Sequence, residues 1–248
     1  MEAMRITLLG TGTSHGVPTI DCMINGFDGC PTGVCRRAMT DPAYRRTRTS
    51  ALLEWPGASV LMDTSQDFYR QVLDRHVARI DAVLYTHAHA DHIYGLPDIR
   101  SYCRQQGSAI DVYGSEETLA VLRTAFDYVF RPPEFVGGGI PTLVPHVLDA
   151  PGDLLGRRVV PVPLEHGVLN GCQGYRVGSF AYLPDVKRIP PTSLDLLQGL
   201  DLLVLNCLRL RPHASHLSLD ESLAYVEALA PRRCVLTHIA HDIDPDAH

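Results

Sequence analysis

The sequence predicts an α/β protein in which two β-sheets pack against each other and helices cover their outer faces. Short apolar or β-branched segments, bounded by Gly, Pro or Asp, recur in both halves of the chain and have the length of strands. A few helical segments lie between them. The 248 residues suffice for one large domain with a buried core. We therefore expect residues 1–248 to form one domain of packed sheets and flanking helices.

Ten segments are predicted to be strands, and two of the breaks between them have the residues of tight turns. Trp55–Ala58 contains Pro-Gly and Val177–Ser179 contains Gly, so each is expected to join antiparallel neighbours. The predicted strands are Arg5–Leu9, Ser50–Trp55, Ser59–Met62, Ala82–Tyr85, Ile110–Tyr113, Val159–Leu164, Gln173–Val177, Ser179–Leu183, Leu202–Asn206 and Cys234–Thr237.

Five segments are predicted to be helices. The last follows Ser218, with Glu221 three residues later, which is the spacing of a capping box. The stretch Phe135–Pro145 is rich in Gly and Pro and is expected to be a loop. The predicted helices are Asp67–His76, Pro97–Gln106, Glu116–Phe130, Ser193–Gln198 and Leu219–Leu229.

Charge and composition exclude several classes of protein. A net charge of -6 argues against a nucleic-acid binder, which needs a basic surface, but not against an anionic substrate at a metal site. No stretch approaches the ~20 apolar residues of a membrane span. The apolar run before Gly10 lacks a signal-peptide cleavage site and is expected to be the first strand.

The chain has seven cysteines, an odd number, and it is not a small protein. This argues against a disulfide framework and favours a cytoplasmic protein with free thiols or a metal site. Cys103, Cys172, Cys207 and Cys234 lie among apolar residues, so we expect them to be small buried side chains.

The segment His87–His92 carries four candidate metal ligands directly after a predicted strand. Alternate residues of an extended chain point the same way, so His87 and His89 are expected to face one ion. Asp91 and His92 then turn toward a second ion. Imidazole nitrogen and carboxylate oxygen are ligands of zinc and manganese hydrolases. The alternative is a surface histidine patch, which the position behind an apolar strand disfavours.

The sequence HAHADH matches the signature of the metallo-β-lactamase superfamily, and the resemblance extends from Ile6 to Asp244. The chain is most similar to the phosphodiesterase branch that includes the phosphoribosyl cyclic phosphate phosphodiesterases. The resemblance implies a four-layer αββα sandwich of two mainly antiparallel sheets flanked by helices, with the site at one edge. The motifs are LLGTGTSHGVP (Leu8–Pro18), RTSALLE (Arg48–Glu54), VLMDTSQDF (Val60–Phe68), GYRVGSFAYLPDV (Gly174–Val186), RPHASHLSLDE (Arg211–Glu221) and LTHIAHD (Leu236–Asp242).

The resemblance also assigns roles to single residues that match the family's motifs. His166 corresponds to the third ligand of the first metal, and Asp185 to a carboxylate that bridges two divalent ions, zinc or manganese. His238 corresponds to the last ligand of the second metal. Asp63 corresponds to a carboxylate that orients ligand imidazoles.

For the reaction, the resemblance implies a phosphodiesterase that acts on a small phosphodiester, a cyclic ribosyl phosphate among the candidates. In such an enzyme a hydroxide held by the two metals would attack phosphorus, and Asp91 is expected to belong to the catalytic set as well as to the ligands. His216 resembles the family's general acid, a role worth ~10²–10⁴ in rate. The alternative for His216 is a surface histidine before the helix that follows Ser218.

Cys22, Cys30 and Cys35 fall in a Gly-rich loop over residues 21–36. Thiolates in such a loop suggest zinc, although their irregular spacing leaves chance open. The resembling phosphodiesterases hold a structural zinc with three cysteines and a histidine three residues after the last active-site ligand. His241 occupies that position. Such a site would clamp the loop and play no chemical part.

Other members of the superfamily supply the rival functions. A tRNA 3′-processing endonuclease shares the histidine motif, but its bacterial members carry a long arm between the residues matching His166 and Asp185, which are too close here. A pyrroloquinoline-quinone-pathway accessory protein of the same fold is the second rival. Thiol-ester or lactone hydrolases have no need of His216, and true β-lactamases generally replace one ligand seen here. A small phosphodiester is the expected partner, without a membrane or nucleic acid, and a homodimer remains open.

Overall fold

The computed structural model describes residues 3–131 and 139–247, and its strands within these ranges form two six-stranded sheets. From edge to edge, the first sheet consists of β1 (Arg5–Gly10), β2 (Ser50–Trp55), β3 (Ala58–Met62), β4 (Ala82–Leu84), β5 (Ile110–Gly114) and β6 (Leu143–Val147). The second consists of β12 (Arg233–Thr237), β11 (Leu202–Asn206), β10 (Phe180–Leu183), β9 (Gln173–Val177), β8 (Arg157–Pro163) and β7 (Gly152–Leu154).

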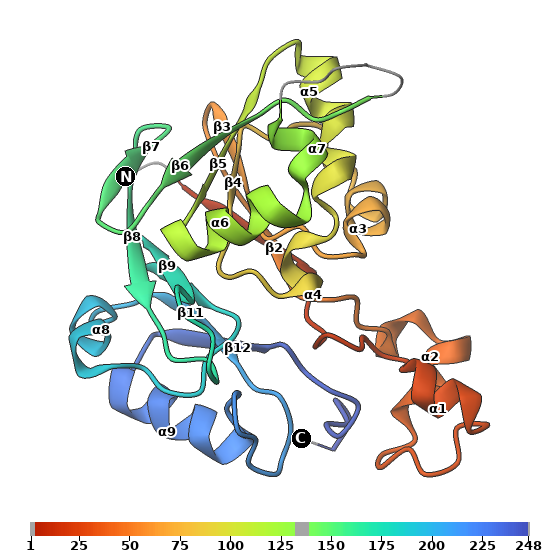
Figure 1. Cartoon of the computed structure of the whole chain (residues 1–248). Helices are drawn as coiled ribbons and strands as arrows, with labels where there is room; N and C mark the ends of the chain where they lie inside the picture. Colours follow the sequence, from red (N-terminus) through yellow and green to blue (C-terminus); the bar gives the residue numbers. More distant parts are fainter. Residues whose placement is uncertain (1–2, 132–138, 248) are drawn as a thin grey trace.

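The helices lie outside the two sheets (Figure 1). Those over the first sheet are α3 (Phe68–Asp74), α4 (Ala90–Ile93), the 3-10 turn η2 (Leu96–Ile99), α5 (Arg100–Gln106), α6 (Glu116–Ala125) and α7 (Asp127–Phe130). Those beside the second are α8 (Pro191–Leu196) and α9 (Leu219–Leu229), while α1 (Ile20–Ile24), α2 (Val34–Thr40) and the turn η1 (Pro42–Tyr44) form a lobe to one side. Among the described helices, none is long and apolar enough to cross a membrane.

Along each strand the side chains point alternately to the two faces of the sheet, and this alternation produces the layers of the fold. On β2, Leu52 packs with the helices of the first sheet, whereas its neighbour Leu53 faces the second sheet. On β11, Val204 belongs to the same core between the sheets, and Leu205 packs toward α8 and α9. Since successive strand residues point to opposite faces, this pattern gives the predicted order of helix, sheet, sheet and helix.

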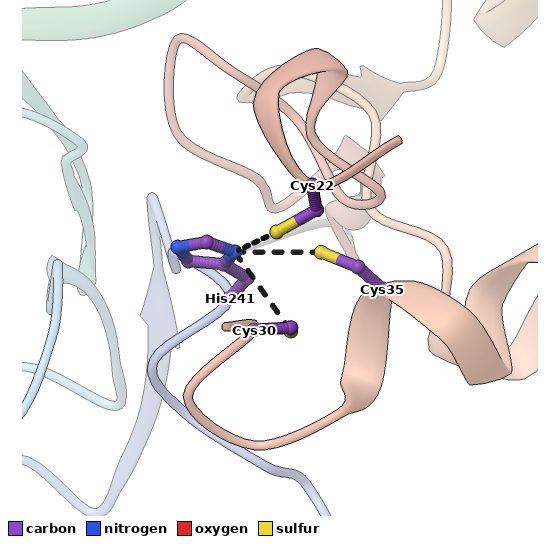
Figure 2. A group of neighbouring side chains, drawn as sticks. All are labelled: Cys22, Cys30, Cys35 and His241. Carbon is purple, nitrogen blue, oxygen red and sulfur yellow. Dashed lines mark hydrogen bonds between the residues drawn. The ribbon is translucent and has the colours of Figure 1, made fainter. Parts of the chain in front are cut away.

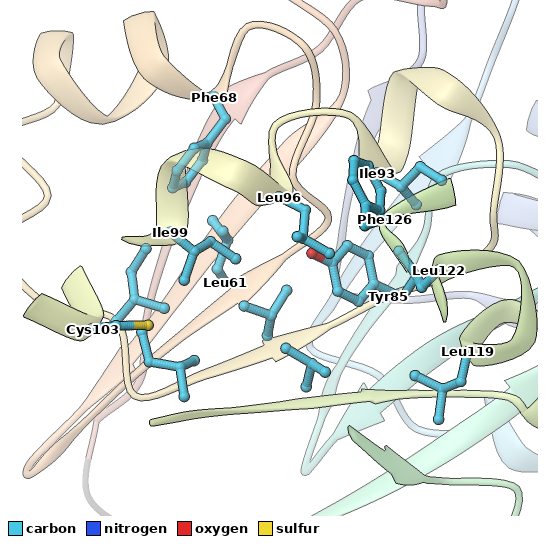
Figure 3. Packing of buried hydrophobic residues seen from close by; sticks show 14 of the residues in the cluster. Leu61, Phe68, Tyr85, Ile93, Leu96, Ile99, Cys103, Leu119, Leu122 and Phe126 are labelled. Atoms are coloured by element: carbon cyan, nitrogen blue, oxygen red, sulfur yellow. The ribbon is translucent and has the colours of Figure 1, made fainter. Parts of the chain in front are cut away.

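The layer between the first sheet and its helices is a continuous apolar cluster (Figure 3). Ile93 and Leu96, on the segment that follows the histidine motif, pack there with Leu61 and Tyr85 of the sheet. All four side chains are buried. Burying such a side chain contributes about 1.5–3 kcal/mol, so the segment that carries the motif is fixed by its apolar residues.

Every predicted strand is present, with small shifts at the ends, and both predicted hairpins join antiparallel strands. The predicted helices are present too, but Glu116–Phe130 is broken at Phe126 into α6 and α7, and Pro97–Gln106 begins as the 3-10 turn η2. The capping box is confirmed, since the Ser218 and Glu221 side chains each accept from the other's backbone N–H. The expectation of mainly antiparallel sheets is wrong, because five of the ten pairings among the described strands are parallel. Helices connect β3, β4, β5 and β6, and such crossovers make neighbouring strands parallel.

The predicted loop Phe135–Pro145 is only partly a loop. Residues 135–138 lie outside the described part of the chain, and Leu143–Val147 is strand β6. Pro145 is tolerated there because β6 is an edge strand, where a missing N–H need not break a ladder. The sequence analysis also missed β7, α1, α2 and α4, which are short.

Replacing Gly95 by Ala is expected to lower the free energy of unfolding by about 1–3 kcal/mol, as overpacking does. A Cβ at this position would lie 2.2 Å from the Ser65 carbonyl oxygen and 2.6 Å from Phe68 Cβ. Gly114→Ala is the matched control, since its Cβ meets nothing closer than 3.4 Å. Urea unfolding measures both, and equal losses would contradict the close approach at Gly95.

Candidate active site

Strand direction brings the predicted site residues to one edge of the molecule. β3 runs parallel to β4, and β10, β11 and β12 run parallel to one another, so their carboxyl ends meet. The segments after these strands carry Asp63, His87, Asp185 and His238, and His166 follows β8. The seven predicted metal ligands fall into two groups, in each of which the ligand atoms lie within 4.8 Å of one another.

The first group contains three imidazoles and one carboxylate. His89 Nδ1 lies 3.0 Å from His87 Nε2 and 3.2 Å from His166 Nε2. Asp185 Oδ2 lies 3.8 Å from His87 Nε2 and 3.6 Å from His166 Nε2. His89 is exposed while the others are buried, so this group opens to solvent on one side.

The second group shares the same carboxylate. Asp185 Oδ1 lies 3.3 Å from His92 Nε2 and 3.0 Å from His238 Nδ1. Asp91 Oδ2 completes the group at 3.4 Å from His92 Nε2. Asp185 therefore turns one oxygen toward each group, as a bridging carboxylate would.

The charge and hydrogen bonding of the two groups fit divalent cations. Among the described residues, the buried His92 Nε2 and Asp185 Oδ1 have no hydrogen-bond partner, whereas buried polar atoms are normally paired. Burial, together with neighbouring His92, lowers the pKa of His87 well below its usual value, so this ring is neutral and offers a lone pair. Burial opposes ionisation of Asp185, but His238 and His92 hold its pKa well below its usual range.

Outer hydrogen bonds decide which ring nitrogen faces inward. Asp63 accepts from the Thr86 backbone N–H, the Thr86 hydroxyl and His92 Nδ1–H, each at 2.8 Å. His166 Nδ1–H donates to the Ser215 carbonyl at 2.7 Å. These bonds leave the Nε2 atoms of both histidines free to ligate. Asp63 itself has a φ of 61°, a left-handed conformation that its three hydrogen bonds hold in place.

A cavity of about 240 Å³ opens beside the two groups. His216 and His213 line one side of it, and His15 lies in its wall. His216 Nδ1 lies 3.7 Å from Asp185 Oδ2, so the predicted general acid is next to the candidate metal site. Burial lowers the pKa of His216 to about 3, against the opposing charge of Asp185.

The three cysteines of the predicted second site meet at one histidine (Figure 2). His241 Nδ1 lies 3.2 Å from Cys22 Sγ, 3.4 Å from Cys35 Sγ and 4.0 Å from Cys30 Sγ. Cys22 lies on α1 and Cys35 on α2, so these two do not lie in a loop as predicted. The His241 carbonyl accepts from the Thr32 hydroxyl at 2.7 Å, which ties the end of the chain to the lobe.

The thiols of this cluster differ in their tendency to ionise. Burial raises the pKa of Cys35 to about 12, and the neighbouring thiols add to the rise. Burial also opposes ionisation of Cys30, but backbone N–H donors from Cys35, Thr32 and Gly33 lower its pKa overall. Three thiolates and one imidazole form a ligand set that binds zinc, and a bound cation would stabilise the negative charges of the three thiolates.

The remaining cysteines agree with their predicted role, since Cys103, Cys172 and Cys207 are buried and Cys234 is half-buried against an apolar cluster. The sequence analysis did not single out Asn206, which is buried at the end of β11 and contacts His216. The only sequence signal for it was a polar residue at the end of a predicted strand.

The chain belongs to the β-lactamase superfamily, because the model of the β-lactamase superfamily domain matches residues 58–239. Among solved structures, a new diphosphatase from the PhnP family is 40% identical, with a TM-score of 0.84 over 97% of this chain and 88% of that chain. This similarity confirms the superfamily fold and places the chain in the PhnP-like branch.

Two curated relatives match parts of longer proteins. The octanoyltransferase of Porphyromonas gingivalis is 35% identical over 240 residues, which are 96% of this chain and 46% of that protein. The ribonuclease Z of Kineococcus radiotolerans is 30% identical over 143 residues, or 55% of this chain and 43% of that protein. The chain thus spans less than half the length of these relatives, and the activities in their names do not transfer with the match.

In the metal-free protein, iodoacetamide is expected to label Cys30 before Cys35. The lower pKa of Cys30 gives more thiolate at a given pH, so its labelling should increase with pH earlier than that of Cys35. Peptide mass spectrometry across pH 6–9 follows both sites. Buried Cys103 serves as an unreactive control. Equal labelling of Cys30 and Cys35 would contradict the role of the backbone donors.

Proposed function

We propose that this chain is a dinuclear metal-dependent hydrolase that acts on a small phosphodiester. The observation that carries the proposal is the placement of Asp185, whose two oxygens face two separate groups of imidazoles 3.0–3.8 Å away. A buried carboxylate shared in this way is the arrangement by which two ions are held close together.

His87, His89 and His166 would hold the first ion, and the second would be held by residues Asp91, His92 and His238, with Asp185 between them. When bound, two divalent ions lower the pKa of water and stabilise charge on phosphoryl oxygens. Either zinc or manganese suits this set of nitrogen and oxygen ligands. A third ion, zinc, would be held by the cysteine cluster and His241, where it has a structural role.

Charge and size favour a small anionic substrate. Two divalent ions bring four positive charges, of which Asp91 and Asp185 offset two, so the floor of the site stays cationic and suits a diester monoanion. The adjoining cavity of about 240 Å³ has room for a small molecule. The PhnP-family diphosphatase that this chain resembles also supports phosphorus chemistry.

His216 supplies the proton for the departing oxygen in this proposal. It lines the cavity, and its ring nitrogen lies within 4.8 Å of the candidate ligand atoms of Asp185 and His238. The negative charge that develops on the substrate favours the imidazolium form and so offsets the burial that depresses the pKa of His216.

The rival nuclease function lacks a feature that it would need. Between His166 and Asp185 the chain forms β9, a turn and β10, which leaves no room for an RNA-binding arm at that point. The accessory-protein function remains the main alternative, and it predicts bound metal without turnover of any diester.

His216→Ala is expected to retain its metals but to lose roughly 10²–10⁴ in kcat on diesters with alkyl leaving groups. Bis(p-nitrophenyl) phosphate, whose leaving group needs little protonation, should be much less affected. Metal content is measured by mass spectrometry, and turnover with Mn²⁺ or Zn²⁺. Loss of metal, or unchanged turnover of alkyl diesters, would refute the acid role. No turnover of any diester by the metal-loaded wild type would reject the proposed function.

Asp63→Asn is expected to weaken binding at the second metal by about 10- to 100-fold, as changes in outer hydrogen-bond partners do. An amide has one acceptor oxygen where the carboxylate offers two, so either the Thr86 backbone N–H loses its acceptor or the Thr86 hydroxyl and His92 Nδ1–H both lose theirs. Competition with a chelator measures the affinity. Asp67→Asn is the control, because Asp67 pairs with Arg48 on a neighbouring loop. Unchanged affinity in Asp63→Asn would count against Asp63 as an orienting group.

A further inference from the structure

Arg209 lies in the wall of the cavity that also contains His216, and the proposed reaction makes no use of it. The residue is half-buried, and its side chain is held by its own loop. Its Nε–H donates to the Arg211 carbonyl at 3.2 Å, and an Nη2–H donates to the Pro212 carbonyl at 2.9 Å. Two backbone carbonyls therefore fix the guanidinium in one position.

Three N–H groups of this guanidinium are left over. A guanidinium has five N–H groups, and the two carbonyls take two of them. Within residues 3–131 and 139–247, Arg209 forms no ion pair with a carboxylate, and its remaining N–H groups have no acceptor. A partly buried charge without a counterion is unfavourable, and the planar fork of N–H groups matches the oxygens of an anion. The cavity wall therefore offers an anion a cationic contact outside the candidate metal groups.

The main chain fixes Arg209 relative to the rest of the site. The Leu219 N–H donates to the Arg209 carbonyl at 2.9 Å, and the Leu208 N–H donates to the Leu217 carbonyl at 2.9 Å. These bonds hold the backbone of Arg209 beside the segment that follows His216. An anion bound by Arg209 would therefore lie at a defined distance from the reacting group.

Two carboxylates line the same cavity, but they come from other elements. Asp21 lies on α1, and Asp242 follows His241 in the segment after β12. Asp242 Oδ1 lies 3.7 Å from Arg211 Nη2, which offsets part of its charge. These carboxylates would repel a negatively charged group, whereas Arg209 would attract it. Charge therefore directs a second anion on the substrate toward Arg209.

We propose that Arg209 is a specificity-determining residue that binds a second anionic group of the substrate, a phosphate or a carboxylate, away from the diester that is cleaved. The consequence for turnover rests on the proposed function, whereas the anion subsite does not. The proposal narrows the substrate class from a small phosphodiester to a small phosphodiester with a terminal anion.

Matched chromogenic diesters test the subsite. The arm of p-nitrophenyl 2-phosphoethyl phosphate, and of its 4-phosphobutyl homologue, ends in a phosphate, and the control diesters end in a hydroxyl group. A 2-carboxyethyl diester tests the carboxylate. In each case water displaces p-nitrophenolate from the diester phosphorus. For the metal-loaded wild type we expect kcat/KM to be about 10- to 100-fold higher for the preferred anionic diester than for its hydroxyl control, mainly through KM. The absence of a preference for any anionic diester would overturn the proposal.

Substitutions separate direct contact from long-range attraction. Arg209→Met is expected to abolish the preference but to retain turnover of the hydroxyl controls, and Arg209→Lys, which keeps the charge without the fork, to retain only part of it. Arg211→Met removes the same charge from the same loop, but this side chain is mostly exposed and lies outside the described lining of the cavity. It should therefore stay close to the wild-type preference, and equal losses in Arg209→Met and Arg211→Met would overturn the proposal. Circular dichroism reports folding, and if Arg209→Met is unfolded the comparison is made with Arg209→Lys.

Binding separates the subsite from the phosphodiesterase function. Calorimetry on the metal-loaded proteins compares 1,2-ethanediol bisphosphate with 2-hydroxyethyl phosphate, the products of the first pair of diesters. The second phosphate should tighten binding by about 10- to 100-fold in the wild type and much less in Arg209→Met. This result without turnover of any diester would support the subsite and reject the proposed reaction. Turnover of the diesters with equal gains from the second phosphate in both proteins would reject the subsite alone.

Discussion

The buried carboxylate of Asp185 is the group on which the rest of the site depends. An isolated charge in the interior is costly, and this one is stabilised only because imidazoles from several strands surround it. Each of its oxygens faces a different ligand group, so both groups must be placed within a few ångströms of one another. That requirement extends to the two sheets, because β4 and β10 carry the opposing halves of the site.

Hydrogen bonds between the two sheets hold the opposing halves of the site close together at the edge where the site lies. The Tyr175 hydroxyl on β9 donates to the Tyr85 carbonyl at 2.7 Å, and the Gln173 N–H donates to the Thr86 carbonyl at 3.0 Å. These bonds fix the backbone directly before the histidine motif against the hairpin that leads to Asp185. The apolar core between the sheets brings the layers together, and these polar contacts set their alignment at the site edge.

The sequence was informative where the signal is local and less so where it depends on long-range packing. The candidate ligands within His87–His92 follow one strand and could be recognised from spacing alone, whereas His166, Asp185 and His238 needed family resemblance because single residues carry no pattern. Parallel pairing was missed because it depends on which strands become neighbours after helical crossovers. Asn206 was missed for the same reason, since its importance arises from contacts with Pro184 and Leu217 that only the fold creates.

The two candidate metal centres are mechanically linked but chemically distinct. His238 and His241 lie three residues apart. Hydrogen bonds from Thr13 to His238 and Ile239 link the segment between the two histidines to the first loop. The lining of the cavity includes His241 as well as His216, so the cysteine lobe forms one wall of this cavity. Three sulfurs and a nitrogen favour zinc, while nitrogen and oxygen ligands accept several divalent ions. Under the proposed function, zinc in the cysteine cluster would let the lobe keep its shape while ions beside Asp185 exchange, and the metal that maintains the pocket would be separate from the metals that act in it.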